Sequence, residues 1–160
     1  MRRITGALAV LVLLGLAACG GRNDSAAPAG LYPGETPQMR ALVSRYARVH
    51  DIPEPLLHRV IQRESDYRAD ARNGPYYGLM QILPQTARTM GHNGPPEELL
   101  NAEVNLQYAG RYLRGAWLVS DGDIDEAVGW YARGYYYEAR DRCLLVATGL
   151  NTREIARHCR

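Results

Sequence analysis

The segment Pro53–Ser65, PEPLLHRVIQRES, carries an acid where its own pattern calls for an apolar residue. Leu57, Val60 and Ile61 recur at spacings of three and four residues, which places them on one face of a helix. Glu64 continues that face. Two interpretations are open at this point. The helix ends near Ile61 and Glu64 is solvated or paired with a neighbouring arginine, or Glu64 is a buried acid whose raised pKa suits proton donation.

Length and charge limit the class of protein. The chain has 160 residues, enough for one domain with a substantial core. All 19 basic residues are arginine, and they are scattered singly rather than gathered in a dense run. This argues against a nucleic-acid-binding surface. No motif indicates a metal or a cofactor, and we expect neither.

Residues 1–18 resemble the signal peptide of a bacterial lipoprotein. MRR is positively charged, residues 4–17 are mostly apolar, and LAAC ends the segment at Cys19. The run is shorter than the roughly 20 apolar residues of a permanent membrane helix. The resemblance implies cleavage before Cys19 and a lipid anchor on it, and an ordinary signal with a coincidental Cys is the alternative. Because Gly20 is not the Asp that commonly retains lipoproteins at the inner membrane, we expect the periplasmic face of the outer membrane.

The other cysteines follow from this assignment. With Cys19 given to lipid, Cys143 and Cys159 remain as a pair, which an oxidising compartment would join in a disulfide. Two free buried thiols are the alternative. Residues 19–37 are rich in Gly, Pro, Ala and polar residues without periodicity, so the lipidated Cys is expected to begin a flexible tether. The domain itself would span residues 38–160.

The domain reads as mainly α-helical, with at most a small β-hairpin. Asp51 is a possible N-cap for the helix that contains Glu64, and Asp123 with Glu126 resembles a capping box. Residues 76–82, YYGLMQI, are the one stretch suited to short extended structure. The expected helices are residues 38–50, residues 53–65, residues 84–90, a longer helix after Asn101, one from residue 124, and a short one after Thr152.

Other polar residues repeat the feature seen at Glu64. Asn105 and Tyr131 each lie within the apolar stripe of a predicted helix. An inward Asn needs hydrogen-bond partners, so each of these alone could be a satisfied core group. Together with Glu64, and with Gln81 beside Met80 in an apolar loop, they predict a shared polar and aromatic cleft.

Four segments, in this order, resemble the lysozyme-like lytic transglycosylases of bacterial cell walls. They are Glu64-Ser65 at a helix end, YYGLMQILPQTA (76–87), NAEVNLQYAGRYL (101–113) and AVGWYARG (127–134). The likeness covers about residues 38–140. It implies a goose-type lysozyme fold of the α+β lysozyme-like class, acting as a monomer on peptidoglycan glycan strands. It also implies cleavage between N-acetylmuramic acid and N-acetylglucosamine.

The resemblance carries roles to individual residues. Glu64 would be the single catalytic acid and base. The family usually has Tyr-Asn-Ala-Gly where this chain has Tyr131-Ala132-Arg133-Gly134, so one amide is absent and its role is lost or supplied elsewhere, for which Arg133 is a candidate. The residues expected to bind substrate or support the cleft are Ser65, Asn73 (where a Ser is common), Tyr77, Met80, Gln81, Asn105 and Tyr131.

One carboxyl group suffices for such a reaction. Most glycosidases use two, but Asp66 points to another side of its helix and Asp70 lies in a loop. In a lytic transglycosylase the C6 hydroxyl of muramic acid attacks C1 of its own sugar, giving a 1,6-anhydro end without water. The alternatives are a hydrolytic goose-type lysozyme, a catalytically silent peptidoglycan-binding lipoprotein, and a purely structural outer-membrane lipoprotein.

Overall fold

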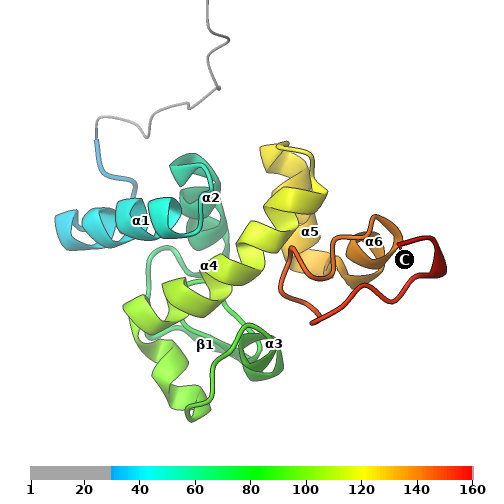
Figure 1. The fold of residues 1–160 in the computed structure, drawn as a ribbon. Coiled ribbons are helices and arrows are strands. Elements are labelled where there is room, and N and C mark those ends of the chain that lie inside the picture. The colour runs from blue at the N-terminus through cyan, green and yellow to red at the C-terminus, as the bar shows by residue number, and fades with distance from the viewer. Residues whose placement is uncertain (1–29, 160) are drawn as a thin grey trace, which may run out of the picture.

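The protein, in a computed structural model that describes residues 30–159, is built mainly from helices, with one small antiparallel hairpin (Figure 1). The predicted fold class is confirmed. The elements are α1 (Pro37–Val49), α2 (Glu54–Ser65), β1 (Arg72–Asn73), β2 (Tyr76–Tyr77), α3 (Pro84–Thr89), the 3₁₀ helix η1 (Pro96–Leu100), α4 (Ala102–Val119), α5 (Ile124–Arg133), α6 (Tyr136–Asp141) and the 3₁₀ helix η2 (Arg157–Cys159).

Helix α4 is the centre of the fold. It runs through the middle of the molecule and contacts α1, α3, η1 and α5 (Figure 1). Asn101 caps its start, since the side-chain oxygen accepts hydrogen bonds from two backbone N–H groups of the first turn. Its fully buried residues include Leu106, Ala109, Leu113 and Ala116. An apolar stripe with small residues lets the neighbouring helices pack closely against it.

Helix α2 has the apolar face that the spacing predicts. Leu57, Val60 and Ile61 are at most 1% exposed. The expected cap is wrong: α2 begins at Glu54 after Pro53, without a side-chain cap. Asp51 instead has a φ of 50° in the turn that leaves α1, where its side chain is too early in the chain to cap α2. The helix ends at Ser65, and its C-cap, Asp66, also has a left-handed backbone conformation.

The predicted tether is too long, because residues 30–36 pack against the domain. The Glu35 side chain is fully buried and accepts hydrogen bonds of 2.6 Å from Arg40 and 2.8 Å from the Tyr32 N–H. The Tyr32 ring lies 4.8 Å from that of His58 on α2. A Cβ at Gly34 would come within 2.7 Å of the Asp66 carbonyl oxygen. This short segment therefore packs against the end of α2, and the ordered domain begins before residue 37.

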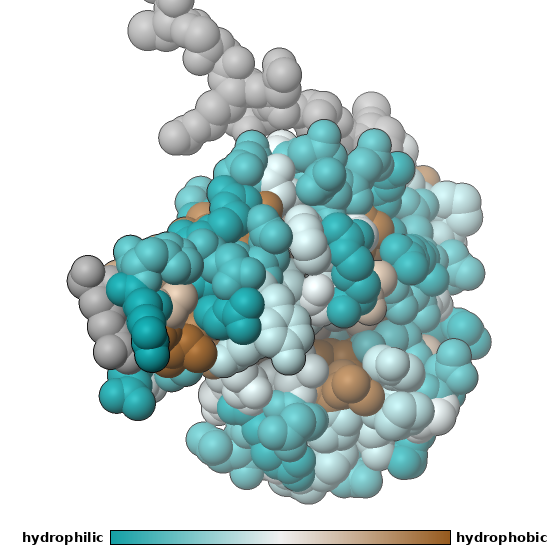
Figure 2. All heavy atoms as spheres, turned by 90° about the vertical axis from the view of Figure 1, so that its right-hand side faces the viewer, coloured by the Kyte–Doolittle hydropathy of each residue, from teal (hydrophilic) through white to brown (hydrophobic). Residues whose placement is uncertain are grey.

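The C-terminal extension also differs from expectation. No regular helix follows Thr152 within the described chain, where only the short η2 forms, and α6 occurs where no separate helix was predicted. A disulfide joins Cys143 to Cys159, with a Cα–Cα distance of 5.5 Å, and Leu145 is fully buried. Figure 2 shows that the described part of the face near α6 is largely hydrophilic, with apolar residues in separate patches.

Several expectations concern residues outside the described range. The predicted signal peptide, the lipid site Cys19 and Gly20 all precede residue 30. Within residues 30–159, no helix has the length and apolar character needed to cross a membrane.

Candidate active site

The loop from Gly78 to Gln81 follows β2 and is shaped by Asn105 of α4. The fully buried Asn105 amide donates hydrogen bonds to the Tyr77 and Leu99 carbonyls, at 2.9 and 2.8 Å. Its oxygen accepts one of 2.9 Å from the Met80 N–H. Gly78 has a φ of 74°, and any Cβ there would clash with the Asn105 amide and the Leu99 carbonyl. Glycine is therefore required for the loop to lie against Asn105.

Two other helices hold the same loop. The Ser65 hydroxyl at the end of α2 donates to the Leu79 carbonyl at 2.7 Å. The Tyr131 hydroxyl of α5 donates to the Met80 carbonyl at 2.8 Å. Side chains from α2, α4 and α5 thus satisfy the buried backbone of one loop, which explains why Asn105 and Tyr131 interrupt the apolar stripes of α4 and α5.

These contacts correct part of the predicted substrate-binding set. Met80 is fully buried and Tyr77 is 6% exposed, and both pack into the core. Neither lines the cavity beside Glu64 that is described below. Ser65 and Asn105 lie behind the loop and act on its backbone. Gln81 differs from these four residues, because it belongs to the loop and also lines the cavity beside Glu64.

A cavity of about 320 Å³, here called the Glu64 cavity, opens beside the end of α2. The side chain of Glu64 is 23% exposed there. Its charged neighbour is Arg63, with 3.6 Å between Nε and Oε1, and no group among residues 30–159 donates a hydrogen bond to it. Of the described residues that line the cavity, Glu64 alone has a carboxyl group. The lining residues are Arg63, Glu64, Asn73, Tyr76, Gln81, Tyr131 and Ala132.

The environment of Glu64 favours its protonated form. Burial raises the pKa of the Glu64 carboxyl above its ordinary value, and the Arg63 cation offsets only part of this. Among the described residues no hydrogen-bond donor adds to the stabilisation of the carboxylate by Arg63. A carboxyl group in this state can donate a proton near neutral pH.

The loop also fixes Gln81, whose φ is 47°. Its amide nitrogen donates to the carbonyls of Gly78 and Ala71, at 2.8 and 3.1 Å. Its amide oxygen has no hydrogen-bond partner among residues 30–159 and is available to accept one in the cavity.

A second cavity of about 280 Å³, here called the Arg133 cavity, adjoins the first. The two share Tyr76, Gln81, Tyr131 and Ala132, and Arg133 lines only the second. Sequence reasoning missed Arg63 and Tyr76 as lining residues. Tyr76 and Tyr77 are neighbours in β2 and point to opposite faces, so alternation alone indicated that one of them faces the cleft without saying which.

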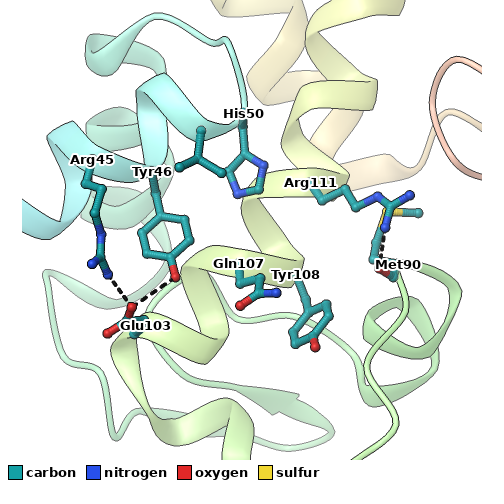
Figure 3. Close-up of a pocket in the computed structure, with 9 residues that line it drawn as sticks. Arg45, Tyr46, His50, Met90, Glu103, Gln107, Tyr108 and Arg111 are labelled. Carbon is teal, nitrogen blue, oxygen red and sulfur yellow. Dashed lines mark hydrogen bonds and ion pairs between the residues drawn. The ribbon is translucent and has the colours of Figure 1, made fainter.

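A larger cavity of about 450 Å³ lies between α1 and α4 (Figure 3). Its acid, Glu103, has a side chain that is 54% exposed. Figure 3 shows that carboxylate contacting Arg45 and the Tyr46 hydroxyl. This carboxylate is largely exposed to solvent and paired with Arg45, whereas the Glu64 carboxyl is only 23% exposed. The chemistry therefore points to the smaller Glu64 cavity.

The braced loop from Gly78 to Gln81 is held by side chains of α2, α4 and α5, and it lies beside a half-buried acid. This arrangement in a mainly α-helical fold is consistent with the lysozyme-like class of glycan-acting proteins. The chain belongs to the transglycosylase SLT domain family, whose model matches residues 41–141. No solved structure matches it. Membership in this family supports a function of the lytic transglycosylase type on peptidoglycan. The matched range includes α2, the braced loop and α5, and hence every element of the site described above.

Proposed function

We propose that the protein is a peptidoglycan lytic transglycosylase in which Glu64 is the only acid and base. The observation that carries this proposal is the isolation of Glu64. It lies half-buried in a cavity, its pKa is raised by burial, and no second carboxyl lines either adjoining cavity among the described residues.

The reaction needs one group that changes role. Protonated Glu64 gives its proton to the glycosidic oxygen between N-acetylmuramic acid and N-acetylglucosamine, and the C1–oxygen bond breaks. The carboxylate then takes the proton from the C6 hydroxyl of the same muramic acid, whose oxygen bonds to C1. The product is a 1,6-anhydro end. Glu64 returns to its protonated state, and no water is consumed.

The cavity walls serve to position the sugar. The free amide oxygen of Gln81 accepts a hydrogen bond from a sugar hydroxyl, and exposed Asn73 offers a further polar contact on the hairpin. The Tyr131 hydroxyl is already used by the Met80 carbonyl, so its ring contributes an apolar wall close to Glu64. Positioning matters here because an attacking hydroxyl tethered to its own C1 replaces an activated water.

Hydrolysis is the nearest alternative reaction on the same fold. It requires a second group to activate water or to form a covalent intermediate. Asp66 and Asp70 are both exposed and line neither cavity. The cavities therefore favour the intramolecular reaction over hydrolysis.

The anchoring proposal rests on sequence. Cleavage before Cys19 and its acylation would hold the domain at a membrane, with the outer membrane favoured by Gly20. Residues 20–29 would then separate the lipid from the segment at residues 30–36 that packs on α2. We also propose that the protein acts as a monomer.

A Glu64→Gln variant tests the assignment of the acid. It keeps the shape of the side chain but cannot donate the proton, so turnover should fall at least about a hundredfold. Binding of glycan should persist, because the walls are unchanged. Asp66→Asn and Asp70→Asn are matched controls that remove exposed carboxylates nearby and should retain activity. Full activity of Glu64→Gln would contradict the proposal.

A further inference from the structure

The adjoining cavities have an unbalanced charge. Arg63 and Glu64 line the first, and Arg133 is the only charged residue among the described lining of the second. When Glu64 is protonated and ready to donate, the cleft carries two cations and no anion. Protonation of Glu64 also removes its ion pair with Arg63. The cleft is therefore electrostatically suited to an anionic substrate at the moment of reaction.

Arg133 is held in place without an acidic partner. Its guanidinium carbon lies 3.8 Å from the centre of the Trp130 ring. No carboxylate within residues 30–159 forms an ion pair with it. Stacking restricts the side chain before any ligand arrives, so less conformational entropy is lost when the guanidinium binds an anion.

Ala132, the residue before Arg133, has a short side chain that leaves space between the two cavities. Ala132 lines both cavities, and its short side chain stands where the resembling family usually has Asn. The chain therefore combines a smaller residue between the two cavities with a cation in the second. In the free protein Arg133 does not enter the Glu64 cavity, so it does not replace the missing amide beside the acid.

We propose that Arg133 binds a carboxylate of the stem peptide on muramic acid, so that the protein selects peptide-bearing strands. This inference rests on the proposed function. In such strands the lactyl group is an amide and carries no charge, which leaves the peptide carboxylates as the anions. A guanidinium can pair with a carboxylate through two parallel hydrogen bonds, which gives direction as well as attraction.

The experiment compares two soluble substrates with the full chain. One is peptide-bearing peptidoglycan strands, and the other is the same strands after carbodiimide amidation has neutralised their carboxylates. Arg133→Gln should lower kcat/KM about fivefold on the charged strands and leave it unchanged on the amidated ones. Arg88→Gln, on α3 and outside both cavities, removes the same charge and should have no effect on either substrate.

Other outcomes separate the two proposals. An equal effect of Arg133→Gln on charged and amidated strands, or none on either, would overturn the inference while leaving the proposed reaction intact. A wild-type protein that forms no anhydro ends from either substrate would overturn the proposed function itself. Strands stripped by an amidase carry a free lactyl carboxylate instead of a peptide. An undiminished Arg133→Gln effect on them would overturn the assignment to the stem peptide.

Discussion

Replacing Asn105 with Ala should both destabilise the protein and inactivate it. The substitution removes three hydrogen bonds from a fully buried position. The Tyr77 carbonyl keeps a bond from the Ile82 N–H, but the Met80 N–H and the Leu99 carbonyl lose their partner. Each buried group left without a partner costs about 1–3 kcal/mol, so the free energy of unfolding should fall by about 2–6 kcal/mol.

Urea unfolding followed by tryptophan fluorescence measures this loss. Gln107→Ala on the exposed side of the same helix is the matched control and should change stability by less than about 0.5 kcal/mol. Asn105→Asp keeps the acceptor for the Met80 N–H but turns a carboxylate oxygen toward the two carbonyls. Its destabilisation should therefore shrink as the pH falls and the Asp becomes protonated.

Activity provides the second measurement for Asn105→Ala. At temperatures where the variant remains folded, turnover should still be lost, because the loop no longer holds Gln81 against the Glu64 cavity. A loss of stability below about 1 kcal/mol together with normal activity would refute the view that Asn105 shapes this loop.

Three further predictions follow from the acid and the cysteines. Because burial raises the folded-state pKa of Glu64, the folded protein binds that proton more tightly, and stability declines as the pH rises from the unfolded pKa to the folded one. The melting temperature of Glu64→Gln should therefore exceed that of the wild type at pH 8, and the two should be equal well below pH 4.5, the ordinary pKa of a Glu carboxyl. A difference in melting temperature that stays the same across this pH range would contradict the prediction. Thiol labelling of unfolded, unreduced protein should find Cys143 and Cys159 blocked, and reduction should cost about 3 kcal/mol for a sequence separation of 16 residues; two free thiols would refute the bond. Cys19→Ala should release the protein from the membrane fraction, and a variant retained like wild type would argue against a lipid anchor.

The part of the site that could be predicted from sequence is the part set by helical periodicity. Glu64 follows Ile61 by about one turn, so the periodicity places it on the inward face, although periodicity alone also allows the helix to end at Ile61. The same reasoning found Asn105 and Tyr131. From the sequence we expected these two side chains to line a cleft. The sequence indicates that a buried polar group needs a hydrogen-bond partner, but it does not identify that partner. Here the partners are backbone groups of the loop from Gly78 to Gln81.

Other features left no periodic signal. Glu35 and Arg40 form an ion pair where a turn leads into α1. Such a contact has no periodic pattern, and the Gly, Pro and Ala content of residues 19–37 indicated a flexible tether. Arg133 was considered as a replacement for a missing amide, yet its place depends on how its side chain stacks on Trp130. Contacts between a loop and a helix, or between two side chains on one helical turn, depend on three-dimensional packing. The spacing of apolar residues in the sequence therefore does not predict them.

Digestion of peptidoglycan in heavy-oxygen water tests the central claim most directly. If Glu64 acts alone and the C6 hydroxyl is the nucleophile, mass spectrometry of the released muropeptides should find 1,6-anhydro ends, each one water lighter than a hydrolysis product and free of the heavy isotope. New reducing ends in place of anhydro ends, with more heavy oxygen at C1 than a sample without enzyme gains by exchange, would contradict the account, because they would show that water, rather than the substrate's own hydroxyl, attacked C1.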